Sequence, residues 1–218
     1  MQVLITGANR GIGAMLAQKA QMLGHHVIGT ARDLTSFNDR IDWLQLDVTS
    51  SDSVQNFAKS MQNRTLDMLI CNAGVYPDKG VASGDITAEM FMSAFQVNSI
   101  GVWEVIQATL PNLRASKGKI AIISSQMGSS ARAPGGSYAY RASKAAVTNL
   151  ACNLAADLKC EGIAVGSYHP GWVRTDMGGD NAEISLEECT NGLWERFTKL
   201  SLETTGVFEG YDGAALPF

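Results

Sequence analysis

The sequence has no stretch of 18 apolar residues, no basic stripe and no cysteines at metal-ligand spacing. It is therefore not expected to span a membrane or to bind nucleic acid. The four cysteines, Cys71, Cys152, Cys160 and Cys189, are expected to be free thiols in a reducing compartment. The chain enters an apolar segment at once, which leaves no room for a signal peptide and favours a cytoplasmic protein.

Composition and patterning favour a single α/β domain over residues 1–218. The chain is 45% hydrophobic and 17% charged, with a net charge of -4, which allows one sizeable core. Helical patterns near 11–23, 51–62, 87–113 and 138–160 alternate with short runs that are apolar throughout. The runs are 3–5, 26–29, 43–46, 66–71, 119–123 and 163–167. This alternation predicts a Rossmann-type, doubly wound parallel sheet with helices on both faces.

The last quarter of the chain is less regular. One helix is predicted over 185–200, with Ser185 and Glu188 placed as a capping box. A final short strand is predicted near Val207 and Phe208.

A glycine-rich turn at 6–13 directly follows the first apolar run. Gly7, Gly11 and Gly13 remove side chains where a backbone must approach a ligand closely. The helix that follows would point its N–H groups and the positive end of its dipole at a dinucleotide pyrophosphate. The spacing is G-x-x-x-G-x-G rather than the general G-x-G-x-x-G, so a turn that binds no ligand is the alternative.

Tyr140 and Lys144 lie four residues apart and so share one face of the helix predicted over 138–160. An ammonium group one turn away would lower the pKa of the phenol and make it a usable acid–base catalyst. An ordinary surface pair is the alternative. The combination of motifs, rather than this pair, decides between them.

The chain resembles the classical short-chain dehydrogenase/reductase family over about residues 1–177. The resemblance depends on six motifs in order: the turn at 6–13, Asn72-Ala-Gly74, Asn98, Ser124-Ser125, Tyr140–Lys144 and Pro170-Gly171. Tyr-Arg-Ala-Ser-Lys, Ser-Ser-Gln-Met-Gly and Tyr211-Asp-Gly are similar to the carbonyl reductase-like branch that includes C-factor and sniffer proteins. The family is a set of single-domain Rossmann-fold oxidoreductases.

The resemblance implies four catalytic residues. Tyr140 would be the acid/base, and Lys144 would hold the nicotinamide ribose and lower the pKa of Tyr140. Ser125 would hydrogen-bond the substrate oxygen. Asn98 would kink its helix and hold a water that links Lys144 to solvent. Ser124 is the alternative to Ser125, whereas Tyr138 lacks a lysine four residues on.

The resemblance also implies a nicotinamide cofactor and no metal. Asp47 and Val48 would bracket the adenine, and Pro170, Gly171, Val173 and Thr175 would fit the carboxamide and phosphates. The implied cofactor-binding residues are Gly7, Asn9, Arg10, Gly11, Ile12, Gly13, Arg32, Asp47, Val48, Asn72, Ala73, Gly74, Tyr140, Lys144, Pro170, Gly171, Val173 and Thr175.

NADP(H) is expected over NAD(H), which stays possible. Asp33 lies 20 residues after Gly13, about where a carboxylate would select NAD, but the resemblance to the family places the selecting position at Ala31, which cannot accept the ribose hydrogen bonds. Arg32 follows and suits a 2′-phosphate, and Arg10 adds a second positive charge.

A short lid over about 176–201 implies an open site, which Trp172, Met177 and Trp194 could line; core packing of these three is the alternative. We expect an NADPH-dependent reductase that converts an aldehyde or ketone to an alcohol. The alternative is a cofactor-binding signalling protein with little turnover. The helices 87–113 and 138–160 also favour a homodimer or homotetramer.

Overall fold

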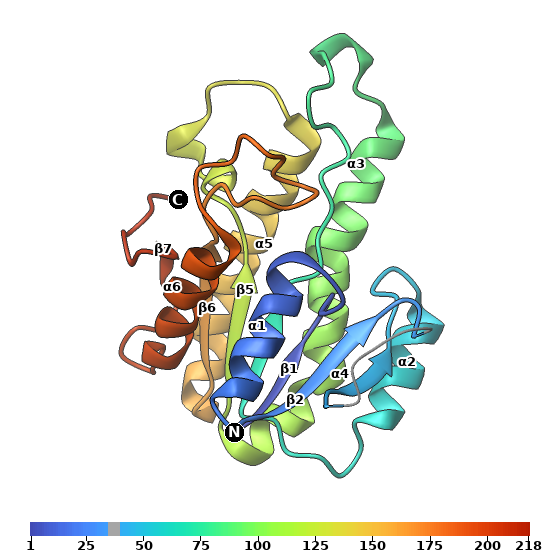
Figure 1. Ribbon diagram of the computed structural model, residues 1–218, viewed down its shortest axis with the longest axis vertical. Helices are drawn as coiled ribbons and strands as arrows, with labels where there is room; N and C mark the ends of the chain where they lie inside the picture. Colours follow the sequence, from blue (N-terminus) through green and yellow to red (C-terminus); the bar gives the residue numbers. More distant parts are fainter. Residues whose placement is uncertain (35–39) are drawn as a thin grey trace.

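The structure, a computed structural model, describes residues 1–34 and 40–218 and is built on one parallel sheet. The strand order is β3-β2-β1-β4-β5-β6-β7 (Figure 1). The strands are β1 (Gln2–Ile5), β2 (His26–Ala31), β3 (Asp42–Gln45), β4 (Met68–Cys71), β5 (Lys119–Ile123), β6 (Ala164–His169) and β7 (Phe208–Gly210). The predicted Rossmann-type doubly wound sheet is confirmed.

Helices cover both faces of the sheet, as the continuous apolar strands require. The helices are α1 (Gly11–Met22), α2 (Ser51–Ser60), α3 (Ala88–Phe95), α4 (Gly101–Ser116), α5 (Tyr138–Leu158) and α6 (Leu186–Lys199). Apolar side chains of α2, α4 and α5 pack with one set of strand residues, and those of α1 and α6 pack with the other set. Among the described helices, none combines the length and apolar character needed to cross a membrane.

The helix predicted over 87–113 is interrupted. A π-helical segment, Gln96–Ile100, separates α3 from α4 and widens the helix by one residue. The segment contains Asn98, whose side chain bonds to backbone outside the helix. The π-helical segment lies at the position predicted for the kink, and a local tertiary contact accompanies it.

The C-terminal predictions are largely confirmed. Ser185 Oγ accepts from the N–H of Glu188 at 3.0 Å, which starts α6. The Glu188 carboxylate does not complete the capping box, because it accepts from the Tyr211 hydroxyl at 3.1 Å. The last strand lies at Phe208–Gly210, beside β6, slightly beyond the predicted position.

Candidate active site

The polar segments that follow the strands meet at one edge of the sheet, because all the strands run in the same direction. The chain leaves β1 for β2 on one side, and β4 then pairs on the other side of β1. Ligands of open parallel sheets bind in the crevice at such a reversal. The glycine turn after β1 and Asn72 after β4 lie at this point.

The glycine turn is shaped for close approach of a ligand to the backbone. Gly7 and Gly11 have φ angles of 63° and 55°, which favour glycine. A Cβ at Gly13 would lie 2.3 Å from the Gly7 carbonyl oxygen, so a side chain there would push α1 away from the turn. Arg10 precedes α1 in extended conformation, and no side chain caps this helix start. The turn therefore fits a pyrophosphate bound by the first N–H groups of α1.

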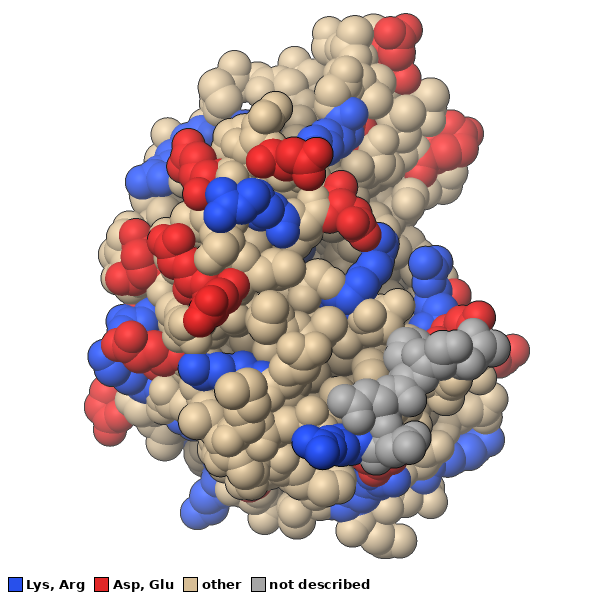
Figure 2. Space-filling model, viewed as in Figure 1, with Lys and Arg blue, Asp and Glu red and all other residues tan. Residues whose placement is uncertain are grey.

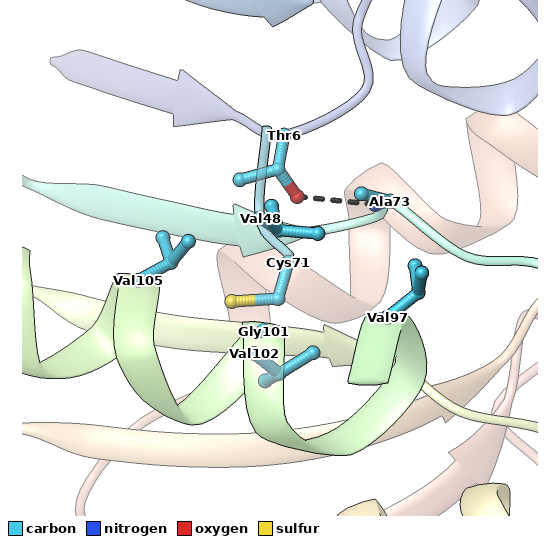
Figure 3. A pocket seen from close by; sticks show the side chains of 8 residues that line it. All are labelled: Thr6, Val48, Cys71, Ala73, Val97, Gly101, Val102 and Val105. Carbon is cyan, nitrogen blue, oxygen red and sulfur yellow. Dashed lines mark hydrogen bonds between the residues drawn. The ribbon is translucent and has the colours of Figure 1, made fainter. Parts of the chain in front are cut away.

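Asn72 ties the glycine turn to the end of β4. Its Nδ2 donates to the carbonyl oxygens of Thr6 and Gly7 at 3.0 and 3.2 Å. The Thr6 hydroxyl accepts from the N–H of Asn72 at 2.9 Å and from the N–H of Ala73 at 3.0 Å; Figure 3 shows the bond with Ala73. Asn72-Ala-Gly74 thus supports the sheet edge, as predicted, while its contact with adenosine stays a prediction.

The edge beyond β2 and β3 carries the residues predicted around the adenine. Hydrogen bonds from Thr49 hold the pKa of Asp47 below its usual range, and the nearby Arg32 guanidinium lowers it further. Arg32 is exposed, and Ala31 is buried and brings no carboxylate to this corner. A narrow pocket lies between the strand ends and α4. It is lined by Thr6, Val48, Cys71, Ala73, Val97, Gly101, Val102 and Val105 (Figure 3).

Three of the predicted catalytic side chains come together beyond β5. Tyr140 and Lys144 lie one turn apart on α5 and are only 8% and 4% exposed. The side chain of Ser125, which follows β5, lies close enough to the Tyr140 hydroxyl to lower its pKa. Lys144 Nζ donates to the carbonyl oxygen of Ile123 at 2.8 Å and lies 5.8 Å from the Tyr140 ring centroid.

Burial governs the acid–base properties of this group. It raises the pKa of Tyr140 to about 12, an effect that the nearby Ser125 side chain opposes and the neighbouring Tyr76 reinforces. Burial also lowers the pKa of Lys144 to about 8. Lys144 is not among the groups that shift the pKa of Tyr140 here, so the prediction that it lowers this pKa stays a prediction.

Ser124, the alternative to Ser125, and Tyr138, the neighbour of Tyr140, lie in surroundings unlike those of the predicted catalytic residues. The Ser124 hydroxyl is buried and bonds to the Lys144 carbonyl oxygen at 3.2 Å and to the Thr148 hydroxyl at 2.5 Å. Tyr138 is 48% exposed. The geometry therefore favours Ser125 and Tyr140 over these neighbours as the reactive hydroxyls.

The Asn98 side chain is hydrogen-bonded to Val75 and to Ser143, close to the predicted catalytic residues. Its Oδ1 accepts from the N–H of Val75, and its Nδ2 donates to the Val75 carbonyl oxygen and to Ser143 Oγ, each at 2.9 Å. A Cβ at Gly74 would lie 3.3 Å from Asn98 Oδ1 and 3.7 Å from Lys144 Nζ. Asn98 and Lys144 thus flank Gly74, and the water that would connect them stays a prediction.

The chain turns sharply after β6. Pro170 is half-buried, and Gly171 has a φ of 85°. A Cβ at Gly171 would lie 2.1 Å from Ile184 Cδ1, so this position also requires glycine. Val173 is buried and forms a parallel bridge with Ile184, which holds 170–175 beside the strand ends.

The segment after this turn reaches both sides of the crevice. The Thr175 methyl group would lie 3.8 Å from a Cβ at Gly11. Arg10 pairs with Asp176 at 2.7 Å, with both side chains exposed, so its guanidinium faces this segment rather than a free ribose site. On the other side, Lys79 Nζ donates to the Met177 carbonyl oxygen at 2.6 Å. The two remaining turn residues are Asn9, which is exposed, and Ile12, which is half-buried.

The predicted lid over 176–201 divides into two parts. Trp172 and Met177 are 49% and 40% exposed near the crevice. Trp194 is buried in the core with α1 and stacks on His25, so it does not line a substrate pocket. Its helix, α6, packs against α1 and covers the sheet, leaving 176–185 as the segment over the crevice.

Two residues of the site were missed from the sequence. Tyr76 stacks on Tyr140 with ring centroids 4.0 Å apart. Asp78 is fully buried and accepts from the N–H groups of Ala139 and Tyr140. Pro77 between them is typical of a turn, but nothing local in the sequence indicates which helix this turn contacts.

Comparison with known proteins bears on this arrangement. The chain matches the family model described as short chain dehydrogenase over residues 1–184. The protein named C-signal of Myxococcus xanthus is 37% identical over 164 residues, covering 74% of this chain and 98% of its own. A 1-hydroxy-2-glutathionyl-2-methyl-3-butene dehydrogenase of Rhodococcus sp. is 31% identical over 225 residues, covering 98% of both chains.

Solved structures agree over the whole chain. An NADPH-bound carbonyl reductase from chicken fatty liver superposes with a TM-score of 0.89 at 28% identity, covering 100% of this chain and 98% of its own. The carbonyl reductase Sniffer of D. melanogaster gives the same TM-score and identity, covering 100% and 99%. The resemblance inferred from the motifs is confirmed, and the chain belongs to the short-chain dehydrogenase family of oxidoreductases.

Proposed function

We propose that the protein is an NADPH-dependent reductase that converts the carbonyl group of a small aldehyde or ketone to an alcohol. The observation that carries the proposal is the buried pair of Tyr140 and Ser125, which are close enough for Ser125 to lower the pKa of the phenol, with Lys144 on the same helix face as Tyr140. This group lies at the sheet edge that also holds the glycine turn. The NADPH-bound carbonyl reductase with the same fold gives independent support.

Tyr140 would act as the general acid in reduction. A pKa of about 12 keeps its hydroxyl protonated at neutral pH, so it has a proton to donate to the substrate oxygen. Ser125 would donate a hydrogen bond to the same oxygen as negative charge develops there. Lys144, with a pKa of about 8, titrates close enough to neutrality to pass a proton toward Tyr140.

A bound NADPH supplies the hydride. The residues described here would hold its parts in order along the sheet edge. Gly7, Gly11 and Gly13 leave room for the pyrophosphate at the start of α1. Lys144 would bond to the nicotinamide ribose, and residues 170–175 would lie against the nicotinamide.

Arg32 supports the choice of NADP(H). Its charge acts on Asp47 at the corner where an adenine ribose would lie. Ala31 offers no carboxylate to bind free ribose hydroxyls. Arg10 would have to leave Asp176 to add to a phosphate site, a small loss because this pair is exposed.

The test is oxidation of NADPH and of NADH, followed by absorbance, against a panel of aldehydes, ketones, diketones and quinones. The panel is broad because the short lid implies an open site, which the exposed Trp172 and Met177 would line. Turnover that prefers NADPH supports the proposal. Tight NADPH binding without turnover of any panel member would contradict it and favour the second candidate.

The second candidate is a cofactor-binding signalling protein with little turnover. The similarity to the protein named C-signal favours it. A binding protein needs the glycine turn but has no need of a buried Tyr140 beside Ser125, and this pair favours the enzyme.

We also propose that the protein forms a homodimer or homotetramer. Ile100 and Trp103, at the start of α4, are 45% and 41% exposed, and Met92 on α3 is 61% exposed. Apolar side chains on one helix pair suit a symmetric contact between copies. Light scattering on the protein eluted from a size-exclusion column should give a mass two or four times that of one 23.3 kDa chain.

A further inference from the structure

The helix that carries Tyr140 and Lys144 begins without a cap of its own. Gly135, Gly136 and Ser137 have φ angles of 94°, 72° and 50°, so the chain enters α5 through three residues in left-handed conformation. Ser137, at the N-cap position, makes no side-chain capping bond. The first N–H groups of a helix need partners when they are buried. Those of α5 find them outside the helix.

Asp78 supplies the missing cap from a distant loop. Its Oδ2 accepts from the N–H of Ala139 at 2.8 Å, and its Oδ1 accepts from the N–H of Tyr140 at 3.2 Å. The carboxylate is 0% exposed and lies at the positive end of the α5 dipole, where negative charge is stabilised. One of its two bonds is made to the backbone of Tyr140 itself.

The same loop also grips the Tyr140 side chain. The Tyr76 ring stacks on that of Tyr140 with planes 18° apart, and its hydroxyl bonds to Ser137 Oγ. The loop is itself anchored, because Asn98 bonds to both backbone groups of Val75. Backbone, ring and helix start are therefore fixed by one segment, 75–78.

We propose that Asp78 is a positioning residue that sets the place of the Tyr140 hydroxyl through the start of α5. This inference rests on the proposed function, in which that hydroxyl donates the proton. Asp78 touches neither substrate nor cofactor in this role. Its loss should therefore impair the chemical step more than it impairs binding.

Steady-state kinetics of two variants test the proposal. Asp78→Asn keeps one acceptor oxygen, and Asp78→Ala removes both. A small displacement of a catalytic group from its reacting partner lowers the rate steeply. We therefore expect kcat to fall by about 10-fold in Asp78→Asn and by about 100-fold in Asp78→Ala. KM and the Kd of NADPH should stay within about twofold of wild type, because Asp78 touches neither the substrate nor the cofactor. Asp85→Asn is the matched control. Asp85 is an exposed carboxylate near Asp78 in the sequence, and its variant should retain kcat.

A second readout does not depend on turnover. In protein labelled at the Cζ carbon of tyrosine, the NMR signal of Tyr140 is assigned by its absence in Tyr140→Phe. In Asp78→Asn this signal should move, while that of Tyr168, in the core away from α5, should stay. An unmoved Tyr140 signal, an unchanged kcat in folded Asp78→Asn, or a loss of kcat matched by the loss of folded protein would overturn the proposal. If wild type turns over no substrate, the proposed function fails and the NMR signal alone decides the position of Tyr140.

Discussion

The ring of Tyr76 lies flat against the ring of Tyr140, with centroids 4.0 Å apart and planes 18° apart. The contact covers the phenol that is the proposed acid and helps to raise its pKa to about 12. Tyr76 follows Asn72-Ala-Gly74 closely along the chain, so the loop that supports the glycine turn also covers Tyr140, the proposed acid. The proposed cofactor site and the proposed proton donor are therefore linked through one short segment.

Tyr76→Ala should lower the pKa of Tyr140, because burial is the main cause that raises it. An acid must be protonated to act, so kcat for carbonyl reduction should begin to fall at a lower pH than in wild type. The pH profile of kcat checks this, with Tyr138→Ala as the control because Tyr138 is exposed on the same helix. A profile that does not move in Tyr76→Ala would show that the stacked ring leaves the acid unaffected.

Arg32→Ala should weaken NADPH binding by about 1.5–3 kcal/mol, the range for a hydrogen bond to a charged group. NADH lacks the 2′-phosphate, so its affinity should change little and serves as the internal control. Isothermal titration of both cofactors makes the comparison. Equal losses for NADH and NADPH, or no loss for NADPH, would remove Arg32 from the phosphate site.

Lys144 should make the free energy of unfolding depend on pH in the alkaline range. Its pKa is lowered from 10.5 to about 8 in the folded protein, so between these values the unfolded chain binds the extra proton. The free energy of unfolding should therefore rise with pH across this window, by about 2–3 kcal/mol relative to Lys144→Met. Urea unfolding of both proteins at pH 8 and pH 10.5 measures the difference. A constant difference would mean that Lys144 keeps its ordinary pKa in the fold.

Gly13→Ala should destabilise the glycine turn. The added Cβ would lie 2.3 Å from the Gly7 carbonyl oxygen and 2.5 Å from Asn72 Nδ2, so α1 must shift, at a cost of about 1–3 kcal/mol. NADPH affinity should fall as well, because the helix start moves from the pyrophosphate site. Gly84→Ala is the control, since a Cβ there meets nothing within 4 Å. Equal stability of the two variants would contradict the packing described for the turn.

Much of the fold and of the central site could be predicted, because the signals are local in the sequence. The apolar strands predict burial on both faces, and the glycine turn and the Tyr140–Lys144 spacing each lie within one element. Figure 2 shows both signs of charge interspersed over one face, in keeping with the absence of a basic stripe.

The remaining features depend on contacts between distant parts of the chain. Asp78 lies 61 residues from the helix start that it caps, and no periodicity indicates that pairing. Trp194 is buried because α6 packs on α1, which a sequence pattern does not reveal. The pKa of Tyr140 follows from burial at the sheet edge and could not be inferred from its spacing to Lys144.

Turnover of Tyr140→Phe with NADPH and a carbonyl substrate tests the proposed mechanism most directly. The phenyl ring keeps the stacking on Tyr76 and removes only the hydroxyl that lies near Ser125. NADPH affinity should be retained while kcat falls by about 100-fold or more, the usual contribution of a general acid. Unchanged turnover would contradict a role for Tyr140 as the proton donor.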